Sequence, residues 1–155
     1  MGLLYFEDFT LGEVVEYGDM EVSSARIKAF AEQFDPQPFH LDEVAARDTM
    51  AGGLIASGWH TAGMLMRMNF DFFISRSTAQ GAPGIEEVNW LKPVRPGDRL
   101  SVRRTTVSAR ASTSRPELGL VGFEFEVLNQ LRETAMTQKN VVIFKRRPIP
   151  GEGAP

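Results

Sequence analysis

The sequence has 155 residues, 43% of them hydrophobic and 24% charged, which suits a single globular domain with one core. It contains no cysteine, so disulfides, zinc–thiolate sites and cysteine nucleophiles are excluded. The formal net charge of −3 argues against binding to nucleic acid. No apolar run reaches the roughly 18 residues of a membrane span, and the N-terminus lacks the basic region of a secretion signal. We therefore expect a cytoplasmic protein with no membrane partner.

The N-terminal part predicts a strand followed by a helix. β-branched and aromatic residues are scattered over residues 12–22, which favours a strand. Ser23 or Ser24 can then cap a helix that ends at Asp35-Pro36. Within that helix, apolar residues recur at the spacing of a face packed on the core: Ile27, Phe30, Ala31 and Phe34.

The loop from Asp35 to His40 carries an acid and a base on a segment stiffened by two prolines. A carboxylate at a helix C-terminus faces the negative end of the macrodipole, and such broken local rules often mark functional sites. Rigid placement of an acid and a base is what general acid/base catalysis requires. The alternatives are an Asx turn for Asp35 and a capping role for His40, at the start of a small helix over residues 41–47.

The central part predicts a long buried helix over residues 57–74, because it is apolar on nearly every side. Its polar exceptions, His60, Arg67 and Asp71, lie on one narrow stripe. Four strands should follow, near residues 84–94, 98–109, 119–129 and 135–146. This order predicts an α+β fold in which an antiparallel sheet wraps around the long helix. We expect one domain over residues 1–147 and a flexible tail over residues 148–155.

Three segments of the chain carry a resemblance to a known family. They are residues 34–43 (Phe-Asp-Pro-Gln-Pro-Phe-His-Leu-Asp-Glu), 53–61 (Gly-Leu-Ile-Ala-Ser-Gly-Trp-His-Thr) and 91–98 (Leu-Lys-Pro-Val-Arg-Pro-Gly-Asp). With them the chain resembles the MaoC-like acyl dehydratases, which have the hotdog fold, and the related (R)-specific enoyl-CoA hydratases. The resemblance implies that Asp35 and His40 form a catalytic dyad that adds water across an enoyl thioester. The hydratase signature usually has asparagine and an aliphatic residue where this chain has Gln37 and Phe39.

The chemistry of hydration adds further candidates. A thioester enolate needs hydrogen-bond donors, and backbone N–H groups at the start of the long helix, around Ser57 and Gly58, are placed to supply them. Glycine at position 58 would let the thioester approach closely. Six residues are candidates for lining the acyl pocket: Gln37, Phe39, Leu54, Ile55, Trp59 and Trp90.

The expected partners follow from this interpretation. We expect an acyl-CoA substrate without a separate cofactor, and a homodimer or an assembly of dimers, as the family resemblance implies. Two histidines outside any ligand cluster predict no metal site. Basic residues that could contact the CoA phosphates are Lys92, Arg95, Arg99, Arg103 and Arg104. The rival functions are a thioesterase, for which Asp71 is the only carboxylate on the long helix, and a non-catalytic acyl-CoA binding module.

Overall fold

The computed structural model describes residues 2–151, so the last four residues of the predicted tail, 152–155, lie outside it. The helices are η1 (Phe6–Asp8), α1 (Ser24–Phe34), α2 (Pro38–Leu41), α3 (Glu43–Arg47), α4 (Gly58–Phe72) and η2 (Ile74–Arg76). The strands are β1 (Val14–Glu21), β2 (Ala79–Gly81), β3 (Glu87–Trp90), β4 (Arg99–Ala111), β5 (Leu118–Leu128) and β6 (Thr134–Lys145).

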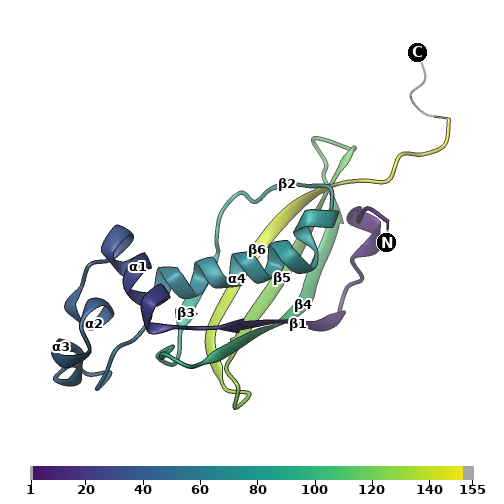
Figure 1. The fold of residues 1–155 in the computed structure, drawn as a ribbon. Helices are drawn as coiled ribbons and strands as arrows, with labels where there is room; N and C mark the ends of the chain where they lie inside the picture. The colour runs from purple at the N-terminus through teal and green to yellow at the C-terminus, as the bar shows by residue number, and fades with distance from the viewer. Residues whose placement is uncertain (1, 152–155) are drawn as a thin grey trace.

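One sheet wraps around the long helix α4 (Figure 1). Its strand order is β1-β4-β5-β6-β2, β3 also pairs with β6, and all of these pairings are antiparallel. Helices α1, α2 and α3 gather at one end of the molecule, and the C-terminal segment leaves at the other (Figure 1). The predicted α+β hotdog architecture is confirmed.

The core lies between α4 and the concave face of the sheet. Alternation along β5 buries Val121, Phe123, Phe125 and Val127, as its sequence pattern predicts. From α4 the buried side chains are Thr61, Met64, Leu65, Met68 and Asn69. The outer face of the helix is different, because Trp59, Met66 and Phe70 are 62%, 52% and 45% exposed. The expectation that α4 is buried on every side is therefore wrong for the single chain.

Two predicted elements differ from the structure. The helix expected over residues 41–47 is present as α3, but it begins only at Glu43, since Asp42 is extended and separates it from α2. The Asp42 side chain accepts hydrogen bonds from the backbone N–H groups of Val44 and Ala45, so it caps α3. His40 consequently lies inside α2 rather than at the start of the following helix.

The other difference concerns the strand expected over residues 84–94. Its regular part is β3, which spans only Glu87–Trp90, and the three-residue strand β2 precedes it. The segment Ala79–Gly81 has no apolar alternation, so nothing in its sequence distinguishes it from a loop. None of the described helices is both long and apolar enough to cross a membrane.

Candidate active site

Asp35 and His40 come together where α1 meets α2. Asp35 is the C-cap residue of α1, and the prolines at positions 36 and 38 turn the chain so that α2 starts immediately afterwards. His40 is only 4% exposed, and its Nε2 lies 3.3 Å from Asp35 Oδ2. The acid and the base that the sequence placed on one loop therefore form a direct pair.

The second ring nitrogen of His40 defines the role of the first. Nδ1 lies 2.7 Å from the backbone oxygen of Ile55, and because a carbonyl can only accept, Nδ1 carries a hydrogen. In the neutral imidazole, Nε2 is then an unprotonated acceptor that faces the Asp35 carboxylate. Two acceptors only 3.3 Å apart favour a proton shared between them, which is the arrangement that proton transfer requires.

Two neutral donors hold the Asp35 carboxylate. The Ser57 hydroxyl donates to Oδ2 at 2.7 Å, and the Gln37 amide donates to Oδ1 at 2.7 Å. The Ser57 bond first, and then the Gln37 bond and the charge of His40, lower the pKa of Asp35 against the opposing effect of burial. These donors compensate the unfavourable position of the carboxylate at the end of α1, so Asp35 is ionised at neutral pH.

Replacing Ser57 with alanine is expected to raise the pKa of Asp35. A carboxyl with a lowered pKa stabilises the fold above its unfolded pKa of ~3.9, and this stabilisation is lost as the pH falls through the folded value. The Ser57→Ala variant should therefore lose less stability than the wild-type protein when the pH falls through this range. An NMR titration of the Asp35 carboxyl in both proteins measures the shift. Thr61→Val removes a nearby hydroxyl that does not contact Asp35, and equal pKa values in wild type and Ser57→Ala would contradict the assignment.

The first turn of α4 lies beside this pair. Ser57 is its N-cap, and the Ser57 hydroxyl oxygen accepts from the backbone N–H of Trp59 at 3.3 Å. Within residues 2–151, the backbone N–H of Gly58 has no hydrogen-bond acceptor. The positive end of the helix dipole coincides with this free donor. The turn is thus suited to stabilise a developing negative charge on an oxygen atom.

A cleft of about 430 Å³ joins the acid–base pair to this helix start. Of the residues predicted to line the acyl pocket, four line the cleft together with Asp35, His40 and Gly58: Gln37, Ile55, Trp59 and Trp90. Phe39 instead packs edge-on against His40 at a ring distance of 4.5 Å, and Leu54 is buried in the core. The sequence reasoning missed several lining residues: Met50, Ala56, Thr61, Leu91, Pro93 and Val94. Met50 follows α3 in a loop whose sequence gives no indication that it returns to the site.

The basic residues considered for phosphate contact are mostly engaged within the chain. Arg99 binds Asp19 through two hydrogen bonds, and Arg103 bridges Glu16 and Glu126. The remaining three are Arg104, which is buried, Arg95, which donates to the backbone oxygen of Ala51, and Lys92, which pairs with Glu133. Only Lys92 of these five lines the cleft.

The second histidine is separate from the acid–base pair. His60 stacks on Phe30 with a ring distance of 4.9 Å, and it is not among the residues that line the cleft. Burial, followed by the charge of Arg26, lowers the pKa of His60. Arg67 and Asp71 lie on the same stripe of the helix as His60, as predicted. They form an ion pair with each other at 3.0 Å.

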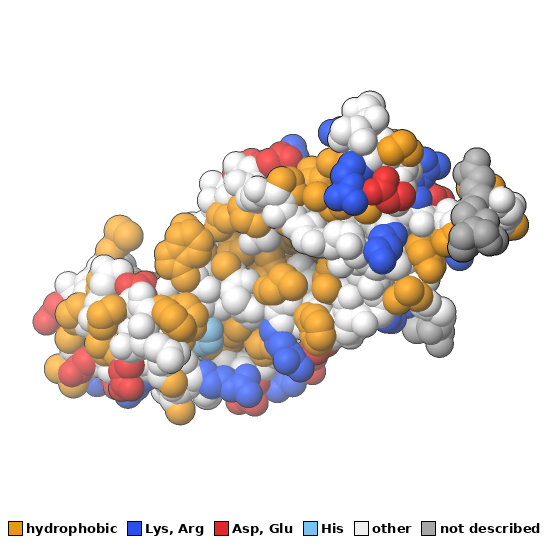
Figure 2. Space-filling view, turned by 90° about the horizontal axis from the view of Figure 1, so that it is seen from above, with side chains coloured by type: hydrophobic (Ala, Val, Ile, Leu, Met, Phe, Trp, Pro, Cys, Tyr) orange, Lys and Arg blue, Asp and Glu red, His pale blue; other side chains and the backbone are white. Residues whose placement is uncertain are grey.

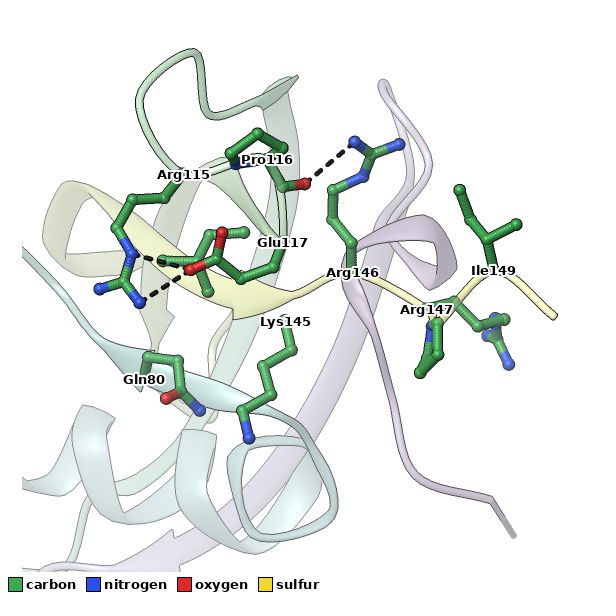
Figure 3. A pocket seen from close by; sticks show the side chains of 10 residues that line it. Gln80, Arg115, Pro116, Glu117, Lys145, Arg146, Arg147 and Ile149 are labelled. Atoms are coloured by element: carbon green, nitrogen blue, oxygen red, sulfur yellow. Dashed lines mark hydrogen bonds and ion pairs between the residues drawn. The ribbon is translucent and has the colours of Figure 1, made fainter. Parts of the chain in front are cut away.

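A larger cavity, of about 740 Å³, lies at the far end of the sheet where β6 leaves it (Figure 3). Four cationic side chains line it, but three of them are already paired: Arg115 with Glu117, Arg146 with Glu7 and Arg147 with Asp8. It contains neither Asp35 nor His40, and the α1–α3 end that carries them lies at the opposite end of the molecule (Figure 1). The smaller cleft is therefore the candidate active site.

This chain is similar in sequence and in fold to known proteins. The sequence model of the family described as "MaoC like domain" matches residues 8–122, which is more than half of the chain. The crystal structure of the MaoC-like dehydratase from Rhodospirillum rubrum is 42% identical, with a TM-score of 0.87, and the match covers 94% of this chain and 99% of that one.

Two further proteins extend the comparison. The uncharacterized protein YdeM from Bacillus subtilis is 27% identical over 140 residues, covering 90% of this chain and 98% of YdeM. The R-hydratase PhaJ1 from Pseudomonas aeruginosa, at 18% identity and a TM-score of 0.73 over 97% of this chain and 94% of its own, shares the fold. The match to the family model and the similarity to the Rhodospirillum protein together show that this chain belongs to the MaoC-like dehydratase family.

Proposed function

We propose that this protein is a hydratase/dehydratase that adds water to an enoyl thioester, or removes it from a 3-hydroxyacyl thioester, with acyl-CoA as the substrate. The observation that carries the proposal is the Asp35–His40 pair, 3.3 Å apart, in a cleft that also contains the free N–H of Gly58. Base, acid and oxyanion donor are the three elements that this reaction requires.

The geometry suggests a separate role for each group in the hydration reaction. The thioester oxygen accepts from the first turn of α4, which draws electrons from the double bond. The acid–base pair takes one proton from a water molecule while the water oxygen bonds to Cβ. The resulting enolate collapses as a proton is delivered to Cα, so that water is added across the double bond. Ser57 and Gln37 keep the carboxylate ionised and oriented throughout.

The rival functions lack comparable support. A thioesterase acting through α4 would need Asp71, but this side chain is exposed and paired with Arg67. A non-catalytic binding module would not require a carboxylate with two donors facing a histidine with a fixed tautomer. The ultraviolet absorbance of crotonyl-CoA tests all three, because hydration removes the enoyl absorbance and hydrolysis releases a free thiol. Saturable binding with neither change would favour the module.

We also propose that the protein assembles as a homodimer through the outer face of α4. Trp59, Met66 and Phe70 follow one side of this helix and remain exposed in the single chain. A view from above shows hydrophobic side chains gathered from the α1–α3 end to the middle of the molecule (Figure 2). Apolar patches of this kind commonly mark protein interfaces. In a twofold-symmetric interface, each of these residues would be buried twice, once from each chain.

Sedimentation equilibrium is expected to give twice the chain mass of 17.2 kDa for the wild-type protein. Met66→Asp places a charge on the proposed interface and should shift the equilibrium toward monomers, because burying an unpaired charge is costly. Ile85→Asp, at a similarly exposed apolar position in the loop before β3, serves as the control. An unchanged mass for Met66→Asp would locate any interface elsewhere.

A further inference from the structure

Trp90 reaches from the edge strand β3 onto the first turn of α4. It ends β3, where it is paired with Met136 of β6, and its indole N–H donates to the backbone oxygen of Gly58 at 2.9 Å. The ring of Trp59 packs edge-on against the Trp90 indole at 5.2 Å. One half-exposed side chain thus connects the edge of the sheet to the helix start that faces the acid–base pair.

The same indole occupies the space next to the Cα of Gly58. A Cβ at this position would lie 2.5, 2.7 and 2.9 Å from Trp90 Cε2, Nε1 and Cδ2. Real Cβ atoms do not tolerate such distances, and a ring fixed by a hydrogen bond and by a second tryptophan cannot move away easily. Proline is favoured at the first position of a helix, so the backbone alone does not demand glycine here.

We propose that Trp90 is a positioning residue that fixes the first turn of α4, and that position 58 is glycine because the indole occupies the space beside it. This inference rests on the proposed hydratase function, since the turn that Trp90 holds carries the free N–H of Gly58. The glycine then leaves room for the Trp90 side chain. The sequence had suggested that it leaves room for the thioester.

The hydrogen bond from Trp90 to Gly58 affects the rate of the reaction because of where it lies. The carbonyl that accepts from Trp90 lies within the same turn as the oxyanion donor, so a shift of this turn displaces the donor. Displacement of catalytic groups by about 1 Å can cost about 10²-fold in rate. Trp90 also lines the cleft, but its hydrogen bond to Gly58 acts on the reaction through this turn, so loss of that bond should lower kcat more than it raises KM.

Four variants test the inference with crotonyl-CoA as substrate. Trp90→Phe keeps an aromatic ring but removes the donor, and kcat is expected to fall about tenfold with little change in KM. Gly58→Ala should lose about 10²-fold because its methyl group displaces the indole. Gly58→Ala combined with Trp90→Leu should be about tenfold more active than Gly58→Ala alone, because the smaller side chain leaves room. Gly84→Ala is the control, since Gly84 lies outside α4 and its Cβ meets nothing within 4 Å.

Melting temperatures of the same variants report on the contact without any turnover. Gly58→Ala should lower the melting temperature in the wild-type background but not in the Trp90→Leu background. A folded double variant no more active than Gly58→Ala would show that the substrate requires the glycine, and this would overturn the inference. Wild-type kcat in Trp90→Phe would likewise overturn the positioning role. A wild-type protein that hydrates no enoyl-CoA would refute the proposed function, while the melting cycle would still decide whether the contact exists.

Discussion

Replacing His40 with alanine is expected to lower kcat for the hydration of crotonyl-CoA by about 10²–10⁴-fold. Of the two histidines in the chain, His40 is the one that lines the cleft in the described structure. Its Nδ1–H is held by the Ile55 carbonyl, so only Nε2 can exchange a proton with substrate or water. Alanine removes that atom and leaves the Asp35 carboxylate without its partner.

The measurement is the rate of loss of enoyl absorbance, with circular dichroism to confirm folding. His60→Gln is the matched control, because His60 packs on Phe30 outside the cleft and its replacement should change kcat only a few-fold. If His60→Gln lost activity as severely as His40→Ala, the assignment of the base would be wrong.

Asp35→Asn extends the same argument to the second member of the pair. Two groups that share one proton act as a unit, so removing either should cost nearly as much as removing both. The double variant Asp35→Asn, His40→Ala is therefore expected to be about as slow as the slower single variant. Losses that multiply in the double variant would indicate two independent roles.

The elements that the sequence predicted well are those whose ends depend on local chemistry. Ser23 accepts from the backbone N–H of Arg26 at the start of α1, and Asp35-Pro36 ends that helix, as expected. The alternation of β5 is equally visible, because one face of the strand is buried and the other is not. The pairing of Asp35 with His40 was also accessible from the sequence, since a short proline-containing loop brings the two together.

The features that escaped prediction depend on contacts between distant parts of the chain. Ser57 binds Asp35 across 22 positions, and Trp90 reaches Gly58 across 32. No periodicity within a segment encodes either contact. The exposed outer face of α4 was missed for a related reason, because an apolar stripe for the core and one for a partner look the same in a sequence.

Glu13→Ala is expected to reduce the free energy of unfolding by about 3 kcal/mol, because it would leave a buried charge without its partner. Arg104 is only 4% exposed, and its Nη2 lies 3.5 Å from Glu13 Oε2. Its Nε and Nη1 have no hydrogen-bond partner within the described residues, although its guanidinium lies 4.5 Å from the ring centre of Phe73 and 5.0 Å from that of Phe123. Burial accordingly lowers the pKa of Arg104.

The two members of this pair should therefore behave differently. Arg104→Met removes the poorly solvated charge itself and fills the site with an apolar side chain, so its cost should be below about 1 kcal/mol. Urea denaturation at one fixed protein concentration measures both changes, since assembly would otherwise contribute to the stability. Glu117→Ala, which breaks the exposed pair with Arg115, should have no measurable effect. A larger loss for Arg104→Met than for Glu13→Ala would mean that the three phenylalanine rings around the guanidinium stabilise the charge by more than its burial costs.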